Sequence, residues 1–158
     1  MKNPNIAHLS HQRTIGAPVV FVGIGLHGGE RVTMKLKPAH AGEGIILKRR
    51  DLATHQQMFR PCWSAVTDTT LCTTIGNRGD NHVSTVEHLL SALSALGIDN
   101  IVIELDGPEV PIMDGSALPF VEAIGNVGIR ELDMPRDVLV VRRPVRLQQG
   151  DSWAELLP

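Results

Sequence analysis

The chain has 158 residues, a formal net charge of −2, 42% apolar residues and 20% charged residues, the composition of an ordinary globular domain. The charge balance gives no indication of a nucleic-acid partner, and the aromatic residues, 3% of the chain with no tyrosine, are too few to favour a base-stacking platform. No stretch approaches the ~20 apolar residues of a membrane span, and residues 1–13 lack the apolar run of a signal peptide. We therefore expect a soluble, cytoplasmic protein that binds no nucleic acid.

The N-terminal residues and the two cysteines allow two further predictions. Residues 1–12 are polar and are expected to fray. Cys62 and Cys72 are too few for a disulfide framework, and they lack the spacing of a zinc knuckle. We expect both to be small, buried, apolar side chains in a reducing compartment.

Residues 18–37 predict an antiparallel hairpin. Residues 18–24 are β-branched and apolar, residues 25–29 form a glycine turn, and residues 31–37 alternate so that every second side chain is apolar. A phosphate-binding loop would require a helix after the glycine turn, but another strand follows. His27, within the turn, is therefore expected to be exposed.

Further strands are predicted before the first helix. Residues 44–49 begin with a short apolar run and predict a strand. Residues 62–66 and 71–75 are short and prone to form strands, with threonines in the second range and between the two. Residues 51–61 are polar enough to be a loop. A turn cluster at 77–81 leads to the helix.

The pattern after that turn predicts an amphipathic helix. Ser84 followed by Glu87 is a capping-box pattern, and Gly97 ends the helix. Apolar residues recur on one helical face: Val86, Leu89, Leu90, Leu93 and Leu96. Glu87 and His88 fall on the flanks of the polar side, away from this face.

Two interpretations of Glu87 and His88 remain open from the residues alone. Glu87 could serve only to cap the helix, and His88 could be an ordinary solvated histidine. Alternatively, His88 is a metal ligand: next to the positive end of the helix dipole it should be neutral, as a ligand must be. A zinc site needs at least three protein ligands.

The second half completes an α+β unit. Residues 100–105 form the strongest strand, and a second helix follows Ser116 as its cap and ends at Gly128. Its apolar face consists of Ala117, Phe120, Val121, Ile124 and Val127. We predict a two-layer α+β sandwich over residues 1–132, with a mostly antiparallel sheet packed with two helices.

Residues 133–158 do not belong clearly to that unit. Strands are predicted at 138–141, 144–147 and 153–157, with a turn at 149–151, but no helix follows to cover them. We expect the first strands of an incomplete second α+β domain that has been cut off, and these strands, 138–157, either are disordered or pair with another chain. The arginines here fit a solvated strand face better than a phosphate patch: Arg136, Arg142, Arg143 and Arg146.

Several motifs in order resemble a known family. They are GIGLHGG at 23–29, DTTLCT at 68–73, STVEHL at 84–89, LGIDNI at 96–101, PIMDGSA at 111–117 and GDSWAE at 150–155. From residue 13 onward the chain resembles the first domain, and the start of the second, of the UDP-3-O-acyl-N-acetylglucosamine deacetylases. These are zinc amidohydrolases of lipid A biosynthesis. The resemblance implies removal of the N-acetyl group from a UDP-linked acylated amino sugar.

The resemblance also implies roles for single residues. Glu87 corresponds to the general base and His88 to a zinc ligand, while Leu71 and Cys72 lie near the active-site passage and His27 near its rim. The family's other zinc ligands, a histidine and an aspartate, and a further catalytic histidine and a lysine belong to the second domain. With one of three ligands present, we expect this chain alone to bind Zn²⁺ weakly or not at all and to be inactive. The alternative is a non-enzymatic interaction or binding module that keeps the fold without the chemistry.

Overall fold

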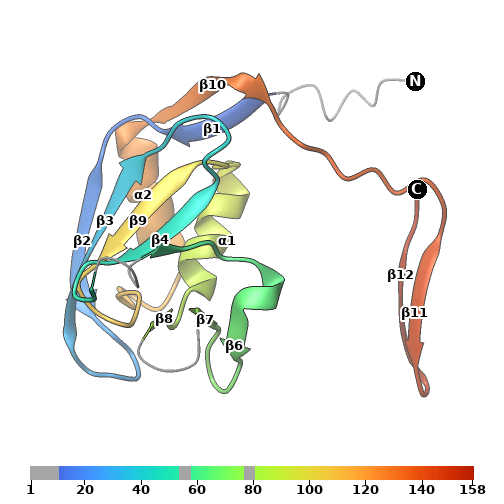
Figure 1. Cartoon of the computed structure of the whole chain (residues 1–158), viewed down its shortest axis with the longest axis horizontal. Helices are drawn as coiled ribbons and strands as arrows, with labels where there is room; N and C mark the ends of the chain where they lie inside the picture. The colour runs from blue at the N-terminus through green and yellow to red at the C-terminus, as the bar shows by residue number, and fades with distance from the viewer. Residues whose placement is uncertain (1–10, 54–57, 77–80) are drawn as a thin grey trace.

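The structure is a computed structural model, and it describes residues 11–53, 58–76 and 81–158. It has the α+β fold that the sequence predicts, with two α-helices and several mostly antiparallel sheets in the described residues (Figure 1). The helices are α1 (Glu87–Leu96) and α2 (Leu118–Val127), and a 3₁₀ helix covers Trp63–Ala65. The strands are β1 (His11–Ile15), β2 (Val19–Ile24), β3 (Arg31–Pro38), β4 (Ile45–Arg49), β5 (Met58–Phe59), β6 (Val66–Asp68), β7 (Thr74–Gly76), β8 (His82–Val83), β9 (Ile101–Leu105), β10 (Ile129–Pro135), β11 (Val145–Gln149) and β12 (Ser152–Leu156).

The central sheet has five strands in the order β2-β3-β9-β4-β5. The pair β4 and β9 is parallel, and the other pairs are antiparallel. The predicted hairpin of β2 and β3 is confirmed, and the apolar residues of β3 point inward as expected. Both helices cover the same face of this sheet (Figure 1).

The core lies between the central sheet and the two helices. Leu89 and Leu93 of α1 and Phe120 and Ile124 of α2 are fully buried. The Phe120 ring meets the Phe21 ring edge to face, with 5.1 Å between centroids, a favourable aromatic geometry. The core continues onto the sheet through Met34, Leu36, Leu47, Ile101, Ile103 and Leu105.

The described part of the chain forms three smaller sheets in addition to the central one, where the sequence suggested a single sheet. Strands β1 and β10 pair along one edge, and β6, β7 and β8 form a three-stranded sheet beside α1. Strands β11 and β12 form a separate hairpin. The domain boundary at residue 132 stays a prediction, since β10 continues past it and pairs with β1 as far as Pro135.

Several predicted elements differ from the structure. Residues 62–66 were expected to be a strand, but the 3₁₀ helix occupies most of this range. Residues 138–141 were predicted to be a strand and form none. Residues 58–59, in the predicted loop, form the short strand β5. Gln12 was expected to belong to a frayed N-terminus and lies in β1. The turn at 77–81, apart from its last residue, lies outside the described residues.

The hairpin of β11 and β12 stands apart from the rest of the molecule (Figure 1). All of its strand residues are exposed. Its turn, at residues 150–151, is where the sequence predicts it. Within the hairpin, the Arg146 guanidinium lies over the Trp153 ring, 4.5 Å from its centroid.

Candidate functional site

The chain enters α1 through a short connection that differs from the predicted capping box. Val86, not Ser84, occupies the N-cap position, and no side chain caps the helix there. The Ser84 hydroxyl lies 3.0 Å from the Thr74 hydroxyl of β7. The capping-box prediction is wrong because Thr85 adopts a left-handed φ of 57°, which turns the chain once more before the helix begins. The predicted end at Gly97 is confirmed, with a left-handed φ of 66°.

Glu87 is the first residue of α1 and is half-buried. Its Oε2 accepts the backbone N–H of Thr73 at 3.0 Å. The carboxylate therefore binds across to the segment before β7 and does not fold back onto its own helix end. A hydrogen bond from a backbone N–H fixes the orientation of a carboxylate while leaving its other oxygen able to accept a proton.

His88 follows on the same turn and is also half-buried. Its imidazole ring makes no hydrogen bond to another described residue. As the sequence predicts, neither Glu87 nor His88 belongs to the core. Two neighbouring, half-buried positions at the start of one helix therefore carry a carboxylate and an imidazole.

The structure brings Leu71 and Cys72 close to Glu87. Both precede Thr73, whose N–H binds the Glu87 carboxylate and whose carbonyl accepts the N–H of Val86 at 3.4 Å. Leu71 is 86% exposed and has a left-handed φ of 63°. Cys72 is half-buried, 3.8 Å by its Sγ from the Thr74 hydroxyl.

Both cysteines are free, and neither is fully buried: Cys62 is exposed and Cys72 half-buried. The expectation of two buried apolar thiols is therefore wrong. Cys62 is exposed because it precedes the 3₁₀ helix that replaces the predicted strand, and that helix buries none of its residues.

His27 is exposed, as expected, and is linked to α1 through Glu109. The backbone N–H groups of His27 and Gly28 donate to the Glu109 carboxylate at 3.0 and 2.9 Å. The Thr85 hydroxyl donates to the same carboxylate at 2.8 Å. The glycine turn thus binds the carboxylate of Glu109. No hydrogen bond in the described structure joins His27 to Glu87.

Glu109 is 6% exposed and lies in the segment that connects β9 to α2. Burial raises the pKa of its carboxyl, but the N–H groups of Gly28 and His27 and the Thr85 hydroxyl outweigh it, so the pKa lies below its ordinary value. Sequence reasoning missed this residue because its partners in the turn are 82 and 81 positions away. No local sequence pattern indicates its role.

Arg49 also supports the site and was not predicted. Its side chain is 4% exposed and points to the helix side of the sheet. One guanidinium nitrogen donates to the His82 carbonyl at 2.6 Å, and two others bind both oxygens of Asp51. Asp51 thereby neutralises the charge of the Arg49 guanidinium. The bond to His82 connects β8, which leads to α1, to the central sheet.

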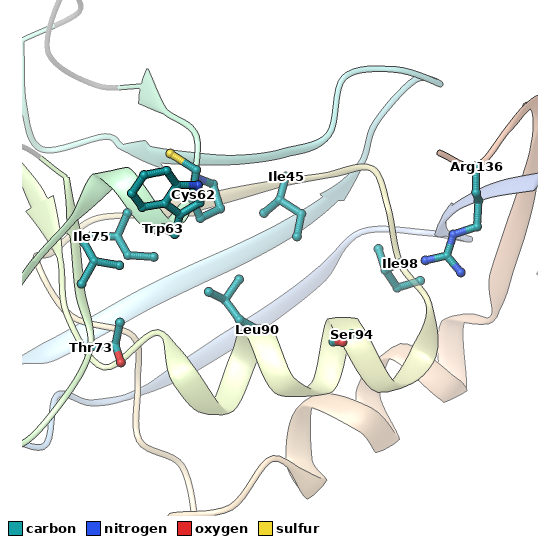
Figure 2. Close-up of a pocket in the computed structure, with 11 residues that line it drawn as sticks. Ile45, Cys62, Trp63, Thr73, Ile75, Leu90, Ser94, Ile98 and Arg136 are labelled. Carbon is teal, nitrogen blue, oxygen red and sulfur yellow. The ribbon is translucent and has the colours of Figure 1, made fainter. Parts of the chain in front are cut away.

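A pocket of about 470 Å³ runs along α1 next to the site. Figure 2 shows Leu90 and Ser94 of α1 on one side and Cys62 and Trp63 on the other. The remaining lining is mostly apolar, with one charged residue: Ile45, Pro61, Val66, Thr73, Ile75, Ile98 and Arg136. Thr73 therefore belongs both to the pocket wall and to the hydrogen bond that holds Glu87.

The imidazole of His88 fits zinc, which takes histidine nitrogen as a ligand. One ligand does not complete a site. In the described ranges, no three histidine, cysteine, aspartate or glutamate side chains gather closely enough to hold a metal ion. No helix of the described chain is long and apolar enough to cross a membrane.

Comparison with known proteins gives one consistent result. The model of the family described as LpxC, UDP-3-O-acyl N-acetylglycosamine deacetylase, matches residues 12–158. A protein named UDP-3-O-acyl-N-acetylglucosamine deacetylase from Syntrophus aciditrophicus is 52% identical over 147 residues, which are 93% of this chain and 46% of that protein. The protein of the same name from Colwellia psychrerythraea is 51% identical over 147 residues, covering 93% of this chain and 48% of its own. The chain thus spans about half the length of the curated relatives it matches.

Proposed function

Because the chain belongs to the UDP-3-O-acyl-N-acetylglycosamine deacetylase family, we propose that it supplies the general base and one metal ligand of a zinc-dependent deacetylase. The substrate is UDP-3-O-acyl-N-acetylglucosamine, the bond hydrolysed is its N-acetyl amide, and the reaction belongs to lipid A biosynthesis in the cytoplasm. One observation carries the proposal. Glu87 uses one oxygen to bind the Thr73 N–H, at 3.0 Å, and does not cap its helix, so its other oxygen is left to act as a base on the residue next to His88 in the chain.

Glu87 is the base in this mechanism. It takes a proton from a water molecule as the water oxygen forms a bond to the acetamide carbonyl carbon. The carbon–nitrogen bond then breaks, acetate is released, and the amine leaves with a proton. The Thr73 N–H holds the carboxylate in one orientation, which is what proton transfer over hydrogen-bond distance requires.

His88 would hold the metal through a ring nitrogen. When bound, zinc polarises the acetamide carbonyl and lowers the pKa of water. Neighbouring helix positions are about 100° apart, so His88 can face the metal while Glu87 faces the water. The other metal ligands and the group that protonates the amine come from outside this chain.

Leu71, Cys72 and His27 are the proposed substrate contacts. Leu71 and Cys72 precede the residue that holds Glu87, and the exposed Leu71 side chain offers an apolar surface there. His27 lies on the turn that Glu109 ties to Thr85, two residues before Glu87.

The test is a chimera in which residues 12–158 replace the matching part of the Syntrophus aciditrophicus protein. We expect the chimera to release acetate from the substrate. Glu87→Gln should lower kcat by about 10²–10⁴-fold while zinc content, measured by metal analysis, stays the same. Glu122→Gln, an exposed carboxylate on α2, is the matched control and should leave kcat unchanged.

Two results would contradict the proposal. One is a Glu87→Gln chimera as active as its parent. The other is an inactive but folded chimera beside an active Syntrophus aciditrophicus protein, which would favour the alternative of a non-enzymatic interaction module.

A further inference from the structure

Thr85 is held in a conformation that its residue type disfavours. It is β-branched, 2% exposed, and has a φ of 57°, in the left-handed region that usually requires glycine. It lies two residues before Glu87. Such conformations persist only where the surroundings over-determine them, and they cluster at functional sites.

Residues 108–110 provide those surroundings. The Ser84 N–H donates to the Pro108 carbonyl at 2.8 Å, and the Val110 N–H donates to the Ser84 carbonyl at 3.0 Å. Between these two bonds, the Glu109 side chain accepts the Thr85 hydroxyl at Oε1. Backbone and side chain together therefore fix the residue that sets the direction of α1.

The same carboxylate holds the glycine turn on its other side. Oε1 also accepts the His27 N–H at 3.0 Å, and Oε2 accepts the Gly28 N–H at 2.9 Å. A β-carbon at Gly25 would collide with the Glu109 carboxylate, so only glycine lets the turn come this close. Two oxygens that both accept are needed, and glutamine offers only one.

We infer that Glu109 is a positioning residue of the proposed deacetylase, holding the His27 turn and the start of the Glu87 helix at a fixed distance from each other. The inference rests on the proposed function for its catalytic consequence. Its structural part, a coupling of two segments through one buried carboxylate, can be tested without activity.

The first experiment measures kinetics in the chimera. Glu109→Gln should lower kcat/KM per folded, zinc-loaded protein by about 10- to 100-fold. Glu104→Gln is the matched control: Glu104 is also a buried carboxylate, 5% exposed, and it binds Lys37 and Arg50. The control should lower Tm by a similar amount while kcat and KM of the folded protein stay at the parent values.

Two substitutions at Thr85 separate the hydroxyl from the side-chain shape. Thr85→Val keeps the branched shape and removes the donor, so it should lower kcat and leave KM nearly unchanged. Thr85→Ser keeps the hydroxyl, so it should retain parent kcat. These variants also test the inference if Glu109→Gln does not fold.

The second experiment measures amide hydrogen exchange by NMR in this chain. In Thr85→Val, the amides of His27 and Gly28 should exchange about tenfold faster, although the substituted residue is in the other segment. In Glu104→Gln they should exchange at the parent rate.

The outcomes are separable. An inactive parent chimera contradicts the proposed function, whereas the exchange rates still decide whether Glu109 couples the two segments. Parent exchange rates at His27 and Gly28 in Thr85→Val, or parent kcat and KM in Glu109→Gln with only Tm lowered, would overturn the positioning role.

Discussion

At the scale of single residues, the site is built from backbone conformations that the residue types disfavour. The described residues with left-handed φ that are not glycine are Leu71, Thr85 and Met113. Two of them flank Glu87, one in the segment that binds its carboxylate and one just before its helix. Strain of this kind costs on the order of 1–3 kcal/mol per residue, and we interpret its concentration here as the cost of orienting the Glu87 carboxylate.

The conformation of Leu71 leads to a stability prediction. Leu71→Gly should raise the free energy of unfolding by about 0.5–1 kcal/mol, because glycine adopts a φ of 63° without strain. The measurement is urea denaturation of this chain. In the chimera the same change should raise KM, since it removes the exposed leucine side chain.

The control is Leu139→Gly. Leu139 is 90% exposed and outside any helix or strand, and its φ is not left-handed. It should change stability by less than about 0.5 kcal/mol. Equal effects of the two substitutions would show that Leu71 stores no strain.

Glu87 and His88 could be singled out from sequence because they are adjacent and stand on a strongly periodic helix. Glu109 could not. Its role depends on Thr85 and His27, and no local pattern indicates which distant N–H groups a carboxylate will meet.

At the scale of elements, periodicity predicted the buried faces of α1 and α2 and their glycine ends, while the start of α1 was wrong. The Ser84 hydroxyl is taken by Thr74 of β7, a tertiary contact that overrides the local capping preference. The strand predicted at 62–66 failed for a similar reason. Strand propensity reflects how well side chains pack against neighbouring strands of a sheet. In the described structure no strand pairs with Trp63–Ala65, so this propensity has no effect there.

The hairpin of β11 and β12 is amphipathic and uncovered. Its register places Val145 opposite Leu156 and Leu147 opposite Ala154, so these four side chains share one face. The other face carries Arg146, Gln148, Trp153 and Glu155. An isolated two-stranded hairpin is marginally stable in water.

We therefore expect this chain to self-associate through the apolar face of the hairpin. Light scattering should show a molar mass that rises with concentration, and Leu147→Ser should reduce it towards the monomer. Gln148→Ser, on the opposite face, should leave the association unchanged. A monomer at every concentration with hairpin amides protected from exchange would contradict this prediction.

At the scale of the whole molecule, the α+β class was predictable from the order of strand and helix patterns, but the strand order was not. Strand β9 follows α1 in sequence and lies between β3 and β4. The position of an apolar strand in the sheet depends on how well the faces of the sheet and the helices fit together. From pattern alone, β9 could equally have been an edge strand, although it carries Ile101, Ile103 and Leu105.

The metal site is also a property of the whole molecule. The described residues bring one imidazole and one carboxylate together at the start of α1 and no further donor to them. After dialysis, this chain should retain less than about 0.1 zinc per molecule, because catalytic zinc sites use three protein ligands. It should also release no acetate. Stoichiometric zinc by metal analysis would contradict this and would make a second copy of the chain the source of the missing donors.

The buried Arg49 has a consequence for the order in which the protein forms. It ties His82 to β4, and β4 joins the central sheet through β9, which is synthesised only after α1. During translation the segment before Glu87 therefore emerges before its anchor is in place. Local helix formation at α1 can be early, but the orientation of the Glu87 carboxylate depends on contacts between residues far apart in sequence, which form slowly. We therefore expect this orientation to form only after β9 has joined the central sheet.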